Sequence, residues 1–267
     1  MSGVIELIAR AANDYGGVCK RTSHRTALLD FPVRFVDGST RLHYLLLNID
    51  GNRVWVKEHS PEHLPAFCPE RHINPDGTFC LSYREVDNLD VIDYLSAVKW
   101  LDTVHKYLML QRRAERLRKW PNNNVWAHGD AAKHEVRALR AAAALGPLIK
   151  TALLSGALSL QRRKSKRRPI LDVWNGGLLL FSVWEKHKRV INRKRECFCR
   201  SNWPRRSKKL RRCKDHASQA VELALAMRDW SDAEEDFWKL VKGYECCGTC
   251  DGCPLSIEAH PEIQSLA

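Results

Sequence analysis

The stretch ERHINPDGTFCLSY, from Glu70 to Tyr83, places a His-x-Asn pair and a Pro-Asp-Gly turn directly ahead of one cysteine. A buried strand has no need of such polar residues, and a zinc site would require a second cysteine close by. Gly77 lets the backbone turn tightly before Cys80 and leaves room beside the thiol. A cysteine in such an open position can act as a nucleophile once it loses its proton. The stretch therefore indicates the mouth of a cysteine-nucleophile site.

The segments around this loop predict an α+β domain over residues 1–146. Three strand-like runs (residues 28–36, 41–49 and 53–59) are separated by Asp37-Gly38 and Asp50-Gly51, the strongest short-range signal for hairpins. They predict an antiparallel meander. Apolar residues at helical spacing predict a helix near residues 4–12, a long helix over residues 91–108 and an alanine-rich helix over about 131–145. Such a sheet with helices gathered to one side is typical of the α+β class.

Residues 147–267 differ in composition and predict a second, mainly helical region that is basic and rich in cysteine. Residues 161–216 contain 20 lysines and arginines against 4 acidic residues, whereas the whole chain carries a net charge of +13. Trp174, Trp184 and Trp203 lie among these cations. Such a pattern is compatible with nucleic-acid binding through phosphate contacts and base stacking. A solvated surface, or a patch that docks an acidic partner, remains the alternative.

The first turns give no sign of a signal peptide, because Glu6 and Arg10 interrupt their apolar positions. Neither of the two most apolar later runs reaches the roughly 18 uninterrupted apolar residues that a spanning helix needs. We therefore expect a soluble, cytoplasmic protein with no membrane partner.

The residues near Cys80 suggest how its thiol would be used. Asn74 offers a side-chain amide of the kind that stabilises an oxyanion, and His72 is expected to orient the turn rather than act as a base. No acid lies nearby in the sequence to complete a protease-like triad, which disfavours hydrolysis. The competing interpretation is that Cys80 is a small buried hydrophobic residue. Cys19 and Cys68 lack a comparable context and are interpreted as core or surface thiols.

The segment HINPDGTFCL resembles the His-Pro-Asn…Gly-x-Ile-Cys-Leu signature of ubiquitin-conjugating enzymes. The later segments WLDTVHKYLMLQ, KWP and HGDAAKHEVRALRAAAALG resemble bacterial members of that superfamily, which occur beside genes for activating enzymes and ubiquitin-like modifiers. The resemblance covers about residues 1–145. It departs from the signature at Ile73, where the family has proline, and in the shorter spacing between Asn74 and Gly77.

The resemblance implies a role for each matching residue. Cys80 would receive a ubiquitin-like modifier as a thioester from an activating enzyme and pass it to a lysine of a target protein. Asn74 and His72 would match the Asn and His of the signature. His128 lies in the loop where relatives place a group that deprotonates the attacking lysine, and an imidazole can accept that proton.

The cysteines of the last third predict metal binding, because they are closely spaced and no secretory signal precedes them. Cys197, Cys199, Cys213 and His216 supply three thiolates and an imidazole, a complete tetrahedral zinc shell, and resemble the C-terminal zinc motif of the SecA translocase. Cys246, Cys247, Cys250 and Cys253 supply four more ligands. We expect two zinc ions, with ligand pairing across the intervening helix left open. An iron–sulfur cluster is the alternative.

Two other functions remain open at this stage. The protein could be a non-catalytic nucleic-acid- or protein-binding zinc module on a ubiquitin-conjugating-like scaffold, in which case no adduct would form on Cys80. It could also be a thiol hydrolase that cleaves a modifier conjugate without ATP.

Overall fold

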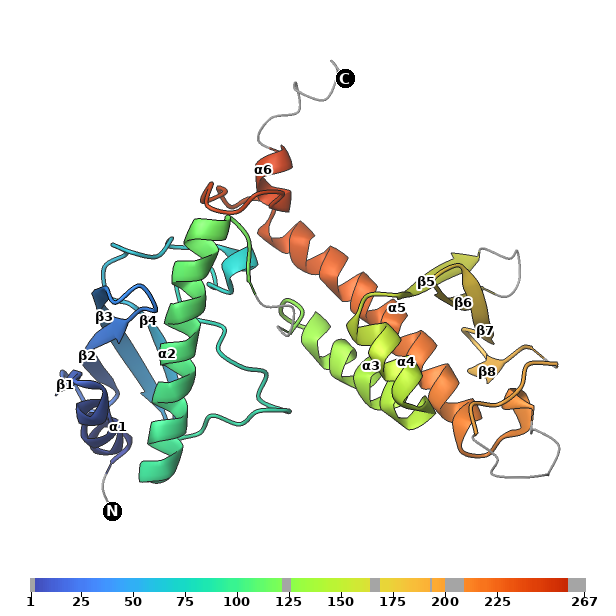
Figure 1. Ribbon diagram of the computed structural model, residues 1–267, viewed down its shortest axis with the longest axis horizontal. Helices are drawn as coiled ribbons and strands as arrows, with labels where there is room; N and C mark the ends of the chain where they lie inside the picture. Colours follow the sequence, from blue (N-terminus) through green and yellow to red (C-terminus); the bar gives the residue numbers. More distant parts are fainter. Residues whose placement is uncertain (1–2, 122–125, 164–168, 193, 200–208, 259–267) are drawn as a thin grey trace. The chain divides into compact units, whose positions relative to one another are not determined.

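The protein is described by a computed structural model that covers residues 3–121, 126–163, 169–192, 194–199 and 209–258. It divides into two compact units, coloured along the chain in Figure 1. The first contains Met1–Val125 together with Lys242–Ala267, and the second contains Trp126–Val241. The sequence placed the boundary at residue 146, whereas the compact units separate at 125 and again at 241.

The first unit contains the predicted meander as a four-stranded antiparallel sheet. Its strands follow the order β1 (Val18–Arg21), β2 (Thr26–Arg34), β3 (Thr40–Asp50) and β4 (Arg53–Glu58). The two Asp-Gly pairs form the turns on either side of β3, as the sequence predicted. Side chains along β2 alternate between buried and half-buried, so one face of the sheet carries the core. The predicted antiparallel meander is confirmed.

Helices cover the core face of this sheet. They are α1 (Val4–Ala12) and α2 (Tyr94–Leu117). The unit also contains the 3₁₀ turns η1 (Asn13–Tyr15) and η2 (Pro69–Arg71) and the short helix α6 (Pro254–Glu258). In Figure 1, α2 runs alongside the sheet, and its buried Trp100 joins the same core as Ile8 and Phe31. A capping box between Asp93 and Ser96 starts α2.

The second unit combines three helices with a second antiparallel sheet. The helices are α3 (Ala131–Leu145), α4 (Pro147–Leu154) and α5 (His216–Val241), with a 3₁₀ turn η3 (Leu210–Arg212). The sheet has the order β5 (Leu158–Arg163), β6 (Ile170–Asn175), β7 (Leu178–Trp184) and β8 (Arg189–Val190). The sequence did not predict these strands.

The boundary at residue 125 follows from where α3 buries its apolar face. Ala141, Ala142 and Leu145 share a core with α5 and with the β5–β8 sheet, rather than with the first sheet. The sequence predicted the extent of α3 correctly but assigned the helix to the first domain. Periodicity identifies an apolar face and does not say which neighbour covers it.

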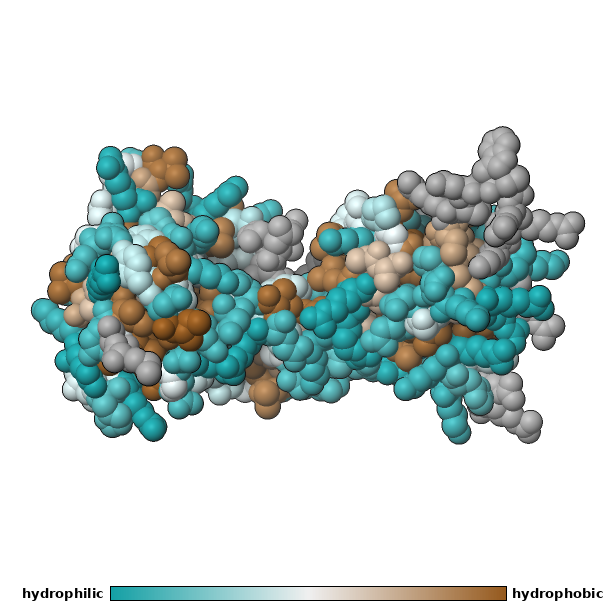
Figure 2. Space-filling view, turned by 90° about the horizontal axis from the view of Figure 1, so that it is seen from below, coloured by the Kyte–Doolittle hydropathy of each residue, from teal (hydrophilic) through white to brown (hydrophobic). Residues whose placement is uncertain are grey.

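The surface of both units is largely hydrophilic on the face shown in Figure 2, with apolar patches between the polar residues. In the part of the chain that the structure describes, no helix is both long enough and apolar enough to cross a membrane.

We predict that Trp100→Ala destabilises the first unit by about 3–5 kcal/mol, because truncating a large core aromatic loses its burial and leaves a cavity. Trp100 has no exposed surface and lies where α2 meets the sheet. Urea denaturation followed by circular dichroism measures the loss.

Leu95→Ala is the matched control on the same helix, since Leu95 is 76% exposed. We expect it to change stability by less than about 0.5 kcal/mol. Equal effects of the two substitutions would contradict the packing described for α2.

Candidate functional site

The turn ahead of Cys80 is closed by hydrogen bonds within the sequence Asn74 to Thr78. The Gly77 N–H donates to the Asn74 carbonyl at 2.9 Å, and the Asn74 N–H donates to the Thr78 carbonyl at 2.8 Å. The Asp76 carboxylate accepts from both the backbone N–H and the hydroxyl of Thr78, at 3.0 and 2.6 Å. Gly77 has φ of 80°, which a residue with a side chain rarely adopts. The Pro-Asp-Gly motif therefore folds as a tight, self-contained turn.

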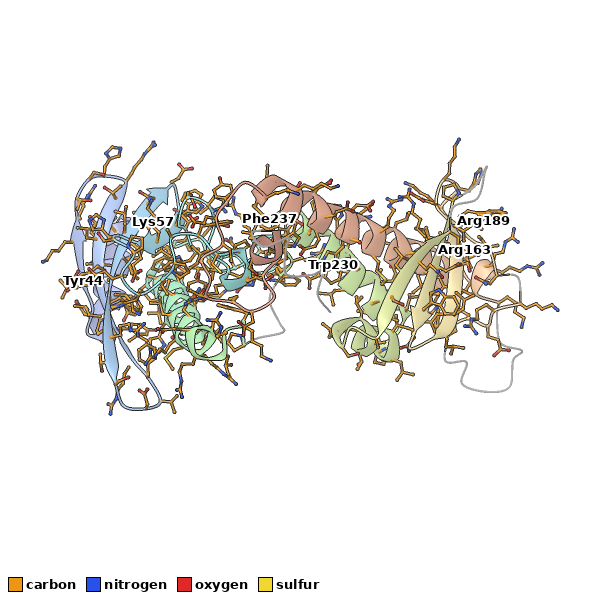
Figure 3. All side chains as sticks on the ribbon, turned by 90° about the horizontal axis from the view of Figure 1, so that it is seen from above. Tyr44, Lys57, Arg163, Arg189, Trp230 and Phe237 are labelled. Carbon is orange, nitrogen blue, oxygen red and sulfur yellow. The ribbon has the colours of Figure 1, made fainter. Side chains whose placement is uncertain are left out.

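Backbone pairing on both sides fixes the position of Cys80. The Phe79 N–H donates to the Val56 carbonyl on β4 at 2.9 Å, and the Cys80 N–H donates to the His72 carbonyl at 2.9 Å. Lys57, labelled in Figure 3, pairs with Thr78 across the same junction and donates its Nζ to the Asp76 carbonyl at 3.2 Å. The cysteine therefore lies at the end of a short extension of the sheet.

Polar groups of α2 support this loop from the core side. The Tyr107 hydroxyl donates to the carbonyls of Arg71 and His72 at 3.2 and 3.0 Å. Arg71 Nε donates to Gln111 Oε1 at 2.7 Å, and Gln111 Nε2 donates back to the Arg71 carbonyl at 2.6 Å. All of these groups are buried, so each bond satisfies a polar atom that would otherwise be costly to desolvate. The ring of Tyr107 also stacks on Phe79, with centroids 4.7 Å apart.

Cys80 is an exposed residue, as a nucleophile for a large substrate must be. The surrounding groups nevertheless desolvate it enough to raise its pKa above the ordinary value of 9.0. Cys80 is therefore a neutral thiol near neutral pH, and no cation among the causes of its shift favours the thiolate.

Asn74, the predicted oxyanion donor, is exposed, and its Nδ2 donates to Thr78 Oγ1 at 3.0 Å. This bond uses one of the two N–H groups of the amide and fixes its orientation. His72 is buried in the left-handed region with φ of 55°, and its ring lies 5.1 Å from that of Trp120. Its carbonyl holds the Cys80 N–H, so His72 shapes the turn through its backbone.

His128, the predicted proton acceptor, belongs to the second unit. Its Nδ1 lies 3.0 Å from Glu234 Oε2, and its backbone N–H donates to Glu234 Oε1 at 3.0 Å. The ring stacks on Phe237, a residue of α5 labelled in Figure 3, with centroids 4.7 Å apart. The role of His128 in proton transfer stays a prediction.

The second unit brings Cys197, Cys199, Cys213 and His216 together. Cys199 Sγ lies 3.5 Å from Cys197 Sγ, 3.5 Å from Cys213 Sγ and 3.1 Å from His216 Nδ1. All four ligand atoms lie within 4.8 Å of one another. Sulfurs on a tetrahedral zinc ion are about 3.8 Å apart, given Zn–S bonds of about 2.3 Å. The group can hold a metal ion such as zinc.

The thiols of the Cys₃His group differ in pKa. Burial opposes ionisation of Cys213, but hydrogen bonds with His216 and Cys197 outweigh it and lower the pKa of Cys213 to about 6. Burial raises the pKa of Cys197 to about 12. A bound cation would displace the remaining thiol protons, which makes its affinity depend on pH.

The other four predicted ligands lie in the first unit, after the end of α5. Helix α5 has 26 residues, a length of about 39 Å at 1.5 Å per residue. The five residues from Val241 to Cys246 span at most about 18 Å. Pairing of cysteines across this helix, left open by the sequence, is therefore excluded by the length of α5. In the part of the chain described, only the Cys₃His group brings three or more ligand atoms within 4.8 Å.

The basic stretch of residues 161–216 is only partly visible. Residues 164–168, 193 and 200–208, with many of its cations and Trp203, lie outside the described residues. Arg163 and Arg189 lie on the second sheet (Figure 3), and Arg163 pairs with the buried Asp172. Arg162 pairs with Glu185 at 2.8 Å. Nucleic-acid binding by this stretch stays a prediction.

Sequence reasoning missed Arg71, Tyr107 and Gln111, which fix the Cys80 loop. Gln111 and Tyr107 are four residues apart on α2, on the face otherwise lined by apolar residues such as Leu108. A polar pair on a buried helical face is the signal that could have identified them, because buried polar groups need partners.

Comparison with protein families gives two matches. Residues 15–122 match the prokaryotic E2 domain, and residues 127–255 match a cysteine-rich domain that lies C-terminal to E2 domains. Searches among curated proteins and among solved structures found no significant match. The E2 match ends near the close of α2, and the cysteine-rich match begins at the second compact unit. The chain therefore consists of a prokaryotic E2 domain of the ubiquitin-conjugating (UBC-like) superfamily followed by a C-terminal cysteine-rich domain.

Proposed function

We propose that this protein carries a ubiquitin-like modifier as a thioester on Cys80 and transfers it to a lysine amine of a target in a bacterial conjugation pathway. An E2 domain implies a conjugating role. The observation that supports the finer assignment is the exposed thiol of Cys80 at the end of a rigid turn, held by the backbone of His72. The partners implied are the modifier, its activating enzyme and the target.

In the loading step, Cys80 Sγ attacks the carbonyl carbon of the thioester that joins the modifier to the activating enzyme. A new C–S bond forms, the enzyme's C–S bond breaks, and the leaving sulfur takes up the proton that Cys80 gives up. Because the resting thiol is neutral, this proton must leave as attack occurs. The neutral form also protects an exposed cysteine from oxidation.

In the transfer step, a lysine amine attacks the thioester carbonyl, an amide bond forms and Cys80 departs as a thiolate. The attack forms a tetrahedral intermediate whose oxygen is negatively charged. One side-chain N–H of Asn74 donates to Thr78, and the other supplies a donor for this oxyanion. The lysine must lose its proton, and His128 with its partner Glu234 is the group that the family resemblance assigns to this task.

We predict that full-length protein becomes loaded through Cys80 when mixed with ubiquitin activated as a C-terminal mercaptoethanesulfonate thioester. This probe replaces the activating enzyme, because it presents the same thioester chemistry. Wild-type protein gains a ubiquitin adduct that excess thiol removes. Cys80→Ser gains either no adduct or an oxyester that thiol leaves intact, and gel electrophoresis without reductant separates these products.

Cys19→Ser is the control, since Cys19 also lies in the E2 domain but is half-buried, and burial raises its pKa to about 11. It should load as wild type does. Undiminished loading of Cys80→Ala would refute the thioester role of Cys80 and leave the scaffold function.

The raised pKa of Cys80 predicts how its alkylation depends on pH. The thiolate is the reactive form, so the rate with iodoacetamide should rise about tenfold per pH unit and reach no plateau below pH of about 9. Trypsin releases residues 72–84, a peptide whose single cysteine is Cys80, and mass spectrometry follows its modification. A plateau near pH 7 would show instead that the loop stabilises the thiolate.

We further propose that the Cys₃His group of the second unit holds zinc. Three thiolates and an imidazole fill every position of a tetrahedral shell, which favours a structural rather than a catalytic ion. The ion would join the segment after β8 to η3 and to the first residue of α5, His216. The cysteine-rich domain would then depend on the metal for its fold.

We expect Cys213→Ser to lose one zinc ion per chain relative to wild type, measured by elemental mass spectrometry after dialysis. Cys213 is buried and contacts His216 Nδ1 at 3.4 Å, so a serine hydroxyl cannot replace its thiolate as a ligand. Cys19→Ser should retain the full metal content. Equal zinc in Cys213→Ser and wild type would contradict this ligand set.

A further inference from the structure

Cys68 begins a tight loop in the E2 domain that is closed by its own backbone. The Cys68 carbonyl accepts from the N–H groups of Arg71 and Ile73, at 3.1 and 3.0 Å, and the Cys68 N–H donates to the Ile73 carbonyl at 3.3 Å. Only 1% of Cys68 is exposed. The thiol therefore lies at a fixed position inside the domain. Cys68 pairs with Ile73, and Ile73 pairs with Phe79, the residue before Cys80.

The chain returns to this loop after α5. The ring of Tyr244 contacts that of Phe67, with centroids 4.8 Å apart, and the Asp251 N–H donates to the Arg118 carbonyl at 2.7 Å. In Figure 1 the segment before α6 accordingly lies beside the end of α2. This return brings the thiols of Cys247 and Cys250 close enough to Cys68 to interact with it electrostatically.

Cys253 lies against the same loop. It is 1% exposed, and its thiol interacts with Cys246 and with the charge of Glu70, the second residue after Cys68. Cys246 is half-buried and immediately precedes Cys247, and neighbouring side chains diverge from the backbone. Cys253 is buried whereas Cys246 is half-buried, so burial favours Cys253 as the fourth member of the group around Cys68.

Arg71 introduces a charge that this cluster has to balance. The guanidinium is 2% exposed, and its hydrogen bonds go to Gln111 and to Thr249 Oγ1, the latter at 3.2 Å. Among the described residues, no carboxylate forms an ion pair with it. A buried cation without an anion is strongly unfavourable. The groups beside it that can become anions are the thiols of Cys247 and Cys250.

Polar hydrogens point to two sulfurs of this segment, those of Cys247 and Cys246. Thr249 accepts from Arg71, which leaves its own proton for Cys247 Sγ at 3.1 Å, and the Gly248 N–H points to Cys246 Sγ at 3.4 Å. Gly248 has φ of 69°, so a side chain at this position would strain the turn.

We propose that Cys68, Cys247, Cys250 and Cys253 form a second metal site, which holds a zinc-class divalent cation and clamps the C-terminal segment onto the E2 domain. Four thiolates around a divalent ion carry two net negative charges, and Arg71 balances one of them. Zinc suits the site because it prefers thiolate ligands in tetrahedral geometry. The site differs from the predicted set of Cys246, Cys247, Cys250 and Cys253 by exchanging Cys246 for Cys68.

Metal binding requires the four sulfurs to move closer together. The sulfurs around Cys68 do not all lie within 4.8 Å of one another, whereas a zinc shell needs them about 3.8 Å apart. Rotation about the Cα–Cβ bond moves each cysteine sulfur, and staggered rotamers are close in energy.

The ion would also stiffen the nucleophile loop. Cys68 pairs with Ile73, Ile73 pairs with Phe79, and the Cys80 N–H bonds to the His72 carbonyl. A metal fixed at Cys68 therefore restrains the backbone strand that positions Cys80. The metal site itself does not depend on the proposed conjugating function, since metal content is measured without modifier.

The test compares full-length Cys68→Ser with Cys246→Ser, each purified with zinc and analysed by elemental mass spectrometry. Wild type should contain two ions per chain, Cys246→Ser two, and Cys68→Ser and Cys253→Ser one each. Two ions per chain in Cys68→Ser would overturn the proposal. It would also be overturned if wild type contained one ion per chain and Cys213→Ser contained none. A brown, sulfide-containing chromophore would overturn the assignment of a single divalent ion.

Cobalt gives a readout of the ligands themselves. In the Cys213→Ser background, added Co²⁺ should produce a thiolate-to-cobalt charge-transfer band that Cys68→Ser abolishes and Cys246→Ser keeps. The unfolding curve of Cys68→Ser in the presence of chelator should match that of wild type in chelator. Such a match excludes misfolding as the cause of the lost metal binding. Hydrogen exchange at the Cys80 amide should accelerate when the metal is removed from wild type, and an unchanged rate would overturn the link to the loop.

Discussion

The buried hydrogen bonds between Arg71 and Gln111 fix the loop from Cys68 to Cys80, and the site depends on them. The guanidinium of Arg71 donates two of these bonds, and Gln111 Nε2 donates the third to the Arg71 carbonyl, so they define both the position and the orientation of the loop. Tyr107 of the same helix also donates to the Arg71 carbonyl and to the next carbonyl, that of His72. Because α2 packs on the sheet through Trp100, the rigidity of the core is transmitted to the nucleophile.

This arrangement gives the thiols of one domain opposite properties. Desolvation by the surrounding groups raises the pKa of the Cys80 thiol. The interaction of Cys247 with Cys68, together with the charge of Arg71, lowers the pKa of Cys247. Desolvation penalises the charged form, whereas a neighbouring cation or donor favours it. The thiol of Cys80 is therefore neutral at rest, whereas that of Cys247 ionises more readily than an ordinary cysteine.

The sequence predicts those features that local physics determines. The Asp-Gly turns predict the meander, and helical periodicity together with Gly146-Pro147 predicts α3 from residue 131 to 145. The second sheet could not be predicted in this way. Its apolar runs, such as Ile170–Asn175, are short and buried on both sides in the middle, a pattern that strands share with buried helices.

The candidate site likewise contains features that the local sequence predicts and features that it does not. The exposure of Cys80 and the tight turn follow from the motif at residues 72–80, and the Cys₃His group follows from its spacing. The proximity of Cys68 to Cys247 does not, because their contact depends on tertiary folding across the whole second unit. A lone cysteine carries no signal of a partner nearly 180 residues away in the sequence.

The return of the chain to the E2 domain needs a strong contact to offset its entropic cost. Closing a loop as long as the second unit costs about 4 kcal/mol by chain statistics. The ion pair of Arg118 with Asp251 is exposed, so solvent and salt screen it. One ring contact adds only about 0.5–1.5 kcal/mol. The zinc ion proposed at Cys68 would supply about 10–16 kcal/mol, which is more than enough to offset the cost of closing the loop.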